Sequence, residues 1–302
     1  MAVPTAMEPD IRSCLGGEFG DAGVSYVTFD GAEGTGDALR LAAEKMDNAP
    51  CVVHVADGLL AQPLAPLTHP TKRGAADMLL LLHRGAPRAD QLDDTARRLL
   101  GIVELEPARN TLGVAGVCLF GLGALRRACA RTETAGSHLD FIAMADRLVT
   151  AGGRTEAQLV RGWQRYAGRA NDLLELNRAT LQLLVTDDEH THDDGTNSIQ
   201  GPVSIHPTAQ VSSSVIVGPV VIGPRAQVLH SYVGPYTSVG AGACIEGAEI
   251  EQSIVSSNAS VRHVECRLAS SVIGARARIH REFSMPRAIR VRISEDADVS
   301  LP

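Results

Sequence analysis

Two hydrophobic patterns divide the chain into a first and a second part. In the first part, from Ile11 to about Leu184, short apolar runs alternate with stretches whose apolar residues recur at helical spacing. This alternation is typical of an α/β layer architecture, in which helices cover a sheet. It predicts strands at Val24–Phe29, Cys51–Val55, Met78–His83, Leu99–Glu104 and Val114–Phe120, and helices at Gly36–Met46, Gly123–Arg131, Asp140–Ala151 and Asp172–Leu184.

The second part has a period of six residues. Aliphatic side chains occupy every sixth position from Ile199 to Val217 and continue, with slips of one residue, to Ile279. A sandwich or barrel strand has a period of two, whereas each short strand of a triangular coil points one side chain inward. We therefore expect a left-handed parallel β-helix from Ile199 to Arg281, with about 18 residues per coil and roughly four to five coils. Residues 283–302 are expected to cover its last coil as a strand.

An acidic, polar segment, Asp187–Asn197, separates the two patterns. Its sequence, DDEHTHDDGTN, contains too little apolar surface to fold alone, so we interpret it as a linker. The predicted organisation is an α/β domain at 1–186, a linker at 187–198 and a β-helix domain at 199–302. His190 and His192 lie among five acidic residues of this segment. These residues are compatible with a metal site, although such clusters also arise by chance in flexible acidic loops.

Composition narrows the classes of function. The net charge of −7 argues against a nucleic-acid partner, because binding phosphates requires clustered Lys and Arg. No apolar run reaches about 18 residues and the N-terminus lacks a signal-peptide pattern, so we expect a cytoplasmic protein with no membrane partner. The cysteines contain no C-x-x-C pair, which indicates buried thiols in a reducing compartment. They are Cys14, Cys51, Cys118, Cys129, Cys244 and Cys266.

Three segments carry a resemblance to a known family. They are GWQRYAGRANDLLELNRATLQLL (162–184), GPVSIHPTAQVSSSVIVGPVVIGP (201–224) and HSYVGPYTSVG (230–240). Together they resemble the long form of the glucose-1-phosphate thymidylyltransferases of actinobacterial deoxysugar pathways, within the sugar-1-phosphate nucleotidylyltransferases. CVVHVADGLL, beginning at Cys51, is similar to the family's strand that ends in Gly-Asp. The resemblance implies a truncated, Rossmann-like nucleotidyltransferase domain followed by the left-handed β-helix.

The family transfers a nucleotidyl group from a nucleoside triphosphate to a sugar 1-phosphate, and the resemblance implies a pair of aspartates that hold Mg²⁺. Asp57, in HVADGL, matches the first aspartate. The second belongs to a W-K-D-x-G motif, where this chain has one residue more between Trp163 and Gly168. The position of the aspartate falls on Arg165 when it is counted forward from Trp163, and on Tyr166 when it is counted back from Gly168. Neither side chain can replace a carboxylate as a ligand of Mg²⁺. We therefore expect no firmly bound cofactor, and Mg²⁺ only if the chain still binds a nucleotide.

Other parts of the family's site are altered as well. Its glycine-rich GGxGTRL loop precedes the segment that matches here, and GGEFGDAG at Gly16–Gly23 reads as a turn before a strand. Gly34 stands where the family contacts the nucleobase, although a plain turn also explains this glycine. The family's E-K-P turn lacks its lysine at Glu104–Pro107, and its acidic sugar-binding segment survives only as Asp140. The candidate substrate-binding residues are therefore Gly34, Asp57, Asp140 and Arg165.

Three functions remain open at this stage. The first is a non-catalytic homologue that regulates or scaffolds an active nucleotidylyltransferase or another enzyme of a deoxysugar pathway. The second is an active enzyme with a remodelled cleft, in which Asp57, Tyr166 and Arg165 are the catalytic candidates. The third is a hexapeptide-repeat acyltransferase with a histidine base, chosen from His206, His230, His263 and His280. In each case we expect the flat faces of the β-helix to form a homo-oligomer.

Overall fold

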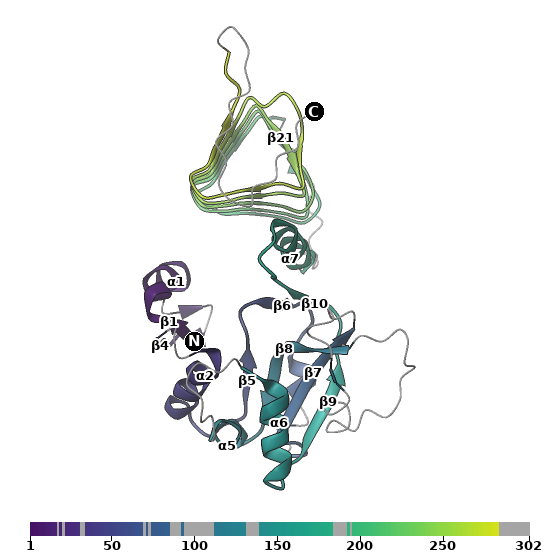
Figure 1. The fold of residues 1–302 in the computed structure, drawn as a ribbon. Coiled ribbons are helices and arrows are strands. Elements are labelled where there is room, and N and C mark those ends of the chain that lie inside the picture. Colours follow the sequence, from purple (N-terminus) through teal and green to yellow (C-terminus); the bar gives the residue numbers. More distant parts are fainter. Residues whose placement is uncertain are drawn as a thin grey trace. The chain divides into compact units, whose positions relative to one another are not determined.

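A computed structural model describes residues 1–16, 18–19, 22–30, 34–68, 71, 74–84, 92–93, 112–130, 139–183, 192–193 and 195–283. The chain divides into two compact units, Met1–Ala167 and Gly168–Pro302 (Figure 1). The first unit is a mixed α/β structure and the second is a parallel β-helix. No helix among the described residues is long and apolar enough to cross a membrane.

The first unit is built on a four-stranded sheet in the order β5-β8-β7-β9. Its strands are β5 (Cys51–His54), β8 (Leu112–Phe120), β7 (Met78–Arg84) and β9 (Thr155–Leu159). Both β5 and β7 run antiparallel to β8, and β9 runs parallel to β7. The strands predicted at β5, β7 and β8 are confirmed, β9 was not predicted, and Leu99–Glu104 lies outside the described residues.

Side chains of the central strands are buried on both faces of this sheet. In β7, Met78 and Leu80 belong to one core cluster, while Leu79 and Leu81 belong to another. Three helices cover the first of these faces and complete its cluster (Figure 1). They are α2 (Gly34–Lys45), α5 (Ala124–Cys129) and α6 (Phe141–Thr150), close to the predicted positions. Trp163 belongs to the cluster on the opposite face.

Smaller elements complete the first unit. Near the N-terminus, β1 pairs in parallel with β4, and β2 pairs with β3 in a hairpin, which agrees with a turn at Gly16–Gly23. A second short pair, β6 with β10, is antiparallel and carries the candidate site. The bounds are β1 (Ala2–Pro4), η1 (Thr5–Met7), α1 (Glu8–Leu15), β2 (Glu18–Phe19), β3 (Ala22–Gly23), β4 (Val27–Phe29), β6 (Gly58–Leu60), η3 (Ala65–Thr68) and β10 (Trp163–Arg165).

The second unit is a left-handed β-helix with a triangular outline (Figure 1). Its first face contains β12 (Ser198–Gln200), β15 (Val215–Val217), β18 (Tyr232–Val233), β21 (Glu249–Glu251) and β24 (Leu268–Ala269). Its second face contains β13 (Val203–Ile205), β16 (Val220–Ile222), β19 (Thr237–Val239), β22 (Ile254–Val255) and β25 (Val272–Ile273). Its third face contains β14 (Gln210–Ser212), β17 (Gln227–Leu229), β20 (Cys244–Glu246), β23 (Ser260–Arg262) and β26 (Arg278–His280). The two residues of β11 (His192–Asp193) pair antiparallel with β12.

The first coils are shorter than the predicted 18 residues, whereas the last coils have 18, as between Val261 and Ile279. Ile199 pairs with Ile216, and Val211 with Val228, so the first coils contain 17 residues each. The strict period of six had placed Val217 inside, but Ile216 is the fully buried residue and Val217 is only half-buried. The slips of one residue in the sequence pattern are therefore turns that contain one residue fewer.

The corners of the coil use left-handed backbone conformations in residues other than glycine. Such residues have positive φ at nine positions, all within the β-helix, among the described part of the chain. One corner column, between the first and second faces, consists of Tyr236, Gln252 and Ser270, with φ of 60, 48 and 48°. This conformation costs about 1–2 kcal/mol per residue. The coils stabilise it by hydrogen bonds, such as the Gln252 N–H to the Pro235 carbonyl at 2.8 Å.

A helix belongs to the second unit together with the coils. α7 (Ala170–Gln182) contacts β19 and β25 on the second face. The Asn177 side chain donates to the Tyr236 carbonyl at 2.9 Å, and the Ser238 hydroxyl donates to the Asn177 Oδ1 at 2.5 Å. The helix itself agrees with its prediction. The sequence had grouped it with the α/β domain at 1–186, whereas these contacts group it with the β-helix.

The cysteines differ in exposure. Cys118, Cys129 and Cys244 are buried and Cys51 is half-buried, as the sequence suggested, but Cys266 is exposed. It precedes Arg267 and β24 at the edge of the coil, outside the inward-pointing positions. The prediction that every cysteine is buried is therefore wrong for Cys266.

Candidate functional site

The candidate residues predicted from the sequence gather at two places in the first unit. Asp57, Arg165 and Tyr166 come together where β6 pairs with β10. Gly34 and Asp140 lie at the first turns of α2 and α6, which cover one face of the sheet. Trp163, which begins β10, belongs to the cluster on the other face. The sequence-based site therefore corresponds to two separate groups of residues.

The pairing of two three-residue strands brings Asp57 to Arg165. Arg165 lies opposite Gly58 in the antiparallel register, one residue beyond Asp57. The Tyr166 N–H donates to the Asp57 carbonyl at 2.7 Å and extends this pairing. The Arg165 Nε then donates to the Asp57 Oδ2 at 2.9 Å, within an ion pair. The two residues on which the second aspartate position could fall thus both contact Asp57, one through its backbone and one through its side chain.

The Trp163 side chain supports this pair of strands. The indole lies so close to Gly58 and Gly116 that a Cβ atom would approach it to 2.5 Å at Gly58 and 2.7 Å at Gly116. The rings of His54 and His83 lie 5.9 and 6.5 Å from the indole, between ring centroids. Sequence reasoning missed Gly116, whose signal is a glycine within the buried strand β8. Glycine is required there because the backbone of β8 approaches an aromatic ring.

The residues around Asp57 do not fit a magnesium ion. Mg²⁺ prefers hard oxygen ligands in octahedral geometry, and carboxylates usually supply the protein's share. Here Asp57 is paired with the guanidinium of Arg165, which can only donate hydrogen bonds and cannot bind a cation. The Tyr166 side chain is a neutral phenol, and the residue is 40% exposed. Within the described residues, no group of three or more His, Cys, Asp or Glu side chains could hold a metal ion. The charge of Asp57 is balanced by Arg165 instead.

Asp140 has a structural partner that explains its presence. It is the N-cap of α6, and its Oδ1 accepts from the N–H groups of Ile142 and Ala143 at 2.9 and 3.0 Å. Such a cap satisfies donors that a helix start leaves unpaired. Gly34 begins α2 with a φ of 79°, a conformation that favours glycine. The Leu139 N–H donates to the Thr35 hydroxyl at 2.9 Å, so the starts of the two helices lie side by side.

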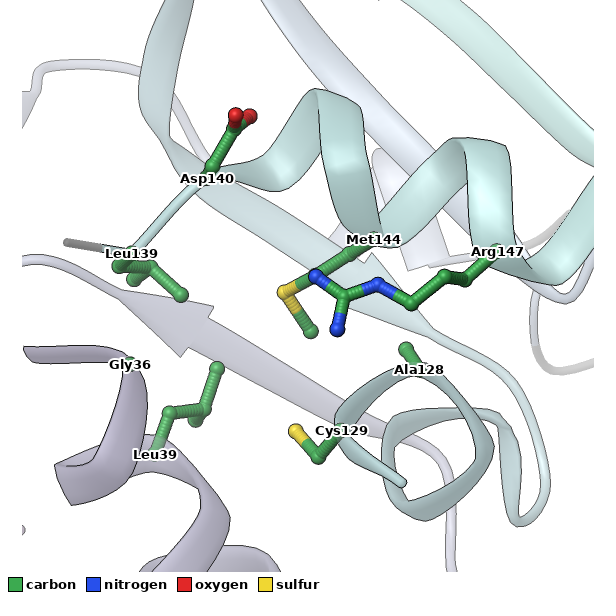
Figure 2. A pocket seen from close by; sticks show the side chains of 8 residues that line it. All are labelled: Gly36, Leu39, Ala128, Cys129, Leu139, Asp140, Met144 and Arg147. Carbon is green, nitrogen blue, oxygen red and sulfur yellow. The ribbon is translucent and has the colours of Figure 1, made fainter. Parts of the chain in front are cut away.

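A hollow between α2, α5 and α6 contains Asp140 at its rim (Figure 2). Its volume is about 20 Å³, enough for about one water molecule and far below the usual range for ligand sites of about 300–1,000 Å³. Figure 2 shows Leu39, Cys129 and Met144 lining it, while the Asp140 carboxylate points away from them. Burial raises the pKa of the Cys129 thiol to about 11, so this thiol stays protonated at neutral pH. The hollow is therefore small and mostly apolar.

Several other candidates lie elsewhere. Glu104–Pro107, His190 and the side chain of His192 are outside the described part of the structure. His230 and His263 lie in one corner column of the β-helix, with Gly247 at the corner between them. The two histidines are therefore two coils, or about 10 Å, apart along the axis. The His263 Nε2 lies 3.9 Å from the Glu246 Oε1. His206 precedes another corner and His280 ends β26, so the four histidines do not form one cluster.

The sequence is similar to curated proteins over most of its length. The sequence is 27% identical over 293 residues to the glucose-1-phosphate thymidylyltransferase of Streptomyces antibioticus, covering 95% of this chain and 81% of that protein. It is 27% identical to the Streptomyces griseus enzyme of the same name, covering 90% and 77%. It is 34% identical over 161 residues to the low-salt glycan biosynthesis nucleotidyltransferase Agl11 of Haloferax volcanii, covering 51% and 43%.

The structural comparison and the family models add little. A solved structure described as a glucose-1-phosphate thymidylyltransferase from Bacillus anthracis, in complex with sucrose, aligns with 63% of this chain and 77% of its own. The TM-score is 0.44 and the sequence identity is 17%. No family model matches the sequence. The similarities to the two Streptomyces enzymes extend over at least 90% of this chain and relate it to the glucose-1-phosphate thymidylyltransferases.

Proposed function

We propose that this chain is a non-catalytic member of its family, which regulates or scaffolds an active nucleotidylyltransferase or another enzyme of nucleotide-sugar synthesis. The observation that carries the proposal is the ion pair between Asp57 and Arg165, with 2.9 Å between Nε and Oδ2. A carboxylate that neutralises a guanidinium has lost much of its attraction for a divalent cation. The position that the resemblance assigns to a second carboxylate holds a cation or a phenol instead.

The expected loss of rate is large. Phosphoryl and nucleotidyl transfer depend on charges positioned around the reacting phosphate, and removal of one such group typically costs about 10² to 10³ in rate. The neighbouring candidates do not compensate. Asp140 caps α6 through two backbone N–H groups, and the hollow beside it is too small for a sugar nucleotide. These features support a chain that keeps the architecture of its family without the chemistry.

A role as a subunit is supported by the surfaces that the architecture provides. The faces of a β-helix are flat, regular and available for pairing with another chain. Val215 points outward on the first face and is 40% exposed, although it is an aliphatic residue in a strand. Val215 is therefore a position at which a contact with a second copy of this chain or with a partner enzyme can be tested.

The catalytic part of the proposal is tested by a pyrophosphate-release assay. The purified chain is incubated with dTTP, glucose 1-phosphate and MgCl₂, beside Asp57→Ala and Arg165→Ala variants. We expect no turnover above background for any of the three proteins. Mn²⁺ binding, followed by electron paramagnetic resonance, should likewise be absent in the wild type. Turnover or Mn²⁺ binding that Asp57→Ala abolishes would contradict the proposal.

The partner part is tested by mixing the chain with an active glucose-1-phosphate thymidylyltransferase. Size-exclusion chromatography with light scattering should detect a mixed complex, and the kcat or KM of the enzyme should change when the chain is added. Val215→Asp is the matched surface variant, because a carboxylate on the first face should weaken a contact made there. Gln227→Asp, on the third face, is the control. If the two proteins elute as separate peaks and the kcat and KM of the enzyme stay unchanged, the chain is not a subunit of this enzyme.

A further inference from the structure

A polar groove lies in the second unit between α7 and one corner column of the β-helix. It is lined by Asn171, Leu174, Glu175 and Arg178 from the helix, and by Tyr236, Gln252 and Ser270 from the column. The helix residues are spaced by three, one and three positions, so they form a single stripe on one side of α7. The column residues are the left-handed corners of three successive coils. Both walls of the groove are therefore regular elements.

Hydrogen bonds fix the two walls relative to each other. Asn177, which lies outside the groove, bonds to the Tyr236 carbonyl and to the Ser238 hydroxyl. Leu181, one turn further along α7, is only 2% exposed. The helix is thus anchored to the coils through Asn177, and its last turn is buried. A groove whose walls are already in position requires little ordering when a ligand binds, which favours affinity.

The size of the groove suits a small organic molecule. Its volume is about 300 Å³, at the lower end of the range of about 300–1,000 Å³ that ligand sites typically have. The hollow beside Asp140 in the first unit has only about 20 Å³. The groove is therefore much the larger of the two, and it belongs to the β-helix unit rather than to the residues that match the family's reaction.

The two charged residues of the groove are available to a ligand. Arg178 and Glu175 are exposed, and neither belongs to an ion pair with another described residue. The Arg178 guanidinium lies over the Tyr236 ring, 5.3 Å from its centroid. A cation held on an aromatic face keeps its N–H groups directed outward at the ring edge. Arg178 can therefore bind a phosphate or carboxylate while the ring holds it in place.

The remaining side chains are hydrogen-bonding groups. Ser270 donates to the Gln252 Oε1 at 3.4 Å, so the amide nitrogen of Gln252 can donate to a ligand. Asn171 supplies a second amide, and Glu175 supplies a carboxylate that can accept from hydroxyl groups. Apolar surface is limited to Leu174 and the Tyr236 ring. This combination suits a molecule with many hydroxyl groups, one anionic group and one apolar face.

We propose that this groove binds a phosphorylated sugar, with Arg178 on the phosphate and with Gln252, Asn171 and Glu175 on the hydroxyl groups. The sugar ring lies along Tyr236 and Leu174. Since the groove joins α7 to three coils, an occupied groove stabilises the attachment of the helix to the second face. The site is independent of Asp57 and of the proposed loss of catalysis.

The test is isothermal titration of the full chain with glucose 1-phosphate, glucose and inorganic phosphate as separate probes. We expect saturable binding of glucose 1-phosphate, and affinities at least about tenfold lower for each of the other two, because each makes only part of the contacts. Arg178→Ala should weaken glucose 1-phosphate about tenfold or more, since it removes charge-assisted hydrogen bonds. Gln252→Leu should weaken it by a smaller factor, about threefold to tenfold.

Two controls separate this site from others. Arg278→Ala makes the same change on the third face and should leave binding unchanged, and so should Asp57→Ala in the first unit. All four variants alter exposed or half-exposed side chains, and circular dichroism verifies their folding. The proposal is overturned if glucose 1-phosphate does not bind at millimolar concentration, if Arg178→Ala has no effect, or if inorganic phosphate alone binds as tightly.

Discussion

The two units bury their apolar residues by different rules. In the β-helix, each inward residue pairs with a residue 16 to 18 positions further along the chain, as Val239 does with Val255 and Ile250 with Leu268. In the α/β sheet, Cys51 pairs with Phe120, and β9 joins β7 although β8, α5 and α6 lie between them in the sequence. A local repeat determines its own register, whereas the sheet order depends on contacts between distant segments. This difference determines what a single substitution should do in each unit.

The largest effect is expected inside the β-helix. Val228→Asp places an unpaired carboxylate at a position that is 0% exposed and should cost more than about 4 kcal/mol. Because each coil rests only on its neighbours, we expect protease cleavage throughout 195–283 and an intact sheet in the first unit. Gln227→Asp, the outward-pointing neighbour, is the control and should be neutral. Limited proteolysis with mass spectrometry measures both, and protection of the coils in Val228→Asp would contradict the expectation.

A smaller loss is expected when Trp163 is removed from the first unit. Trp163→Ala leaves a cavity against Gly58 and Gly116 and should cost about 3–5 kcal/mol. Thermal melting followed by far-UV circular dichroism should show a lower transition for the first unit and an unchanged one for the β-helix. Tyr166, which follows the same strand, is exposed, and Tyr166→Ala should change the free energy of unfolding of either unit by no more than about 1 kcal/mol. A common shift of both transitions would show that the units do not unfold separately.

Asp77 provides a pH-dependent test of the sheet. Its Oδ2 accepts from the Arg154 N–H at 2.8 Å and its Oδ1 from Arg127. The backbone hydrogen bond from Arg154 is the main cause that lowers the pKa of this carboxyl below 3.8, and Arg127 adds to it. A lowered pKa in the folded state stabilises the protein above the unfolded value, and this contribution is lost as the pH falls through the folded value.

The corresponding variant is Asp77→Ala. It should lower the free energy of unfolding by about 2 kcal/mol at pH 7, because the Arg154 N–H loses its acceptor. The difference from wild type should shrink below about pH 4. Urea unfolding at pH 7 and pH 3.5 measures this. An equal difference at both pH values would show that the carboxylate charge contributes nothing.

The smallest effect concerns reactivity rather than stability. Cys266 is exposed on the β-helix, so an aromatic disulfide reagent should modify it within minutes in the folded protein. Cys118 and Cys129 should react only after unfolding, because burial raises the pKa of both thiols. Peptide mass spectrometry identifies the modified residues, and Cys266→Ser is the control. Rapid modification of Cys118 in the folded state would contradict the buried sheet.

The same difference explains what the sequence could predict. The β-helix was predicted from its repeat. Val217, at the start of the second coil, was wrongly assigned to the interior, since a turn with one residue fewer leaves Ile216 inside. In the first unit, β9 reads TEAQL, whose Glu, Ala and Gln are poor strand formers, so its pattern gave no signal. This segment forms a strand because it pairs with the edge of β7 that β8 does not occupy.

The candidate site was predictable only in part. Arg165 and Tyr166 were identified as the two alternatives for one position, and the structure places both against Asp57. Their arrangement depends on the pairing of β6 with β10, which are too short to show any periodicity. The role of Asp140 as an N-cap was missed, although an Asp directly before an apolar helix is the usual signal for one.

The 17-residue repeat of the first coils has a consequence for how such a chain changes length in evolution. Deleting residues 216–232 would join Val215 to Val233, which already occupies the place of Ile216 one coil further along. Each remaining strand keeps a neighbour of the same kind, and each corner keeps its conformation. Whole coils can therefore be gained or lost by recombination between equivalent positions. The sheet of the first unit allows no comparable deletion, because its neighbouring strands are not repeats of one another.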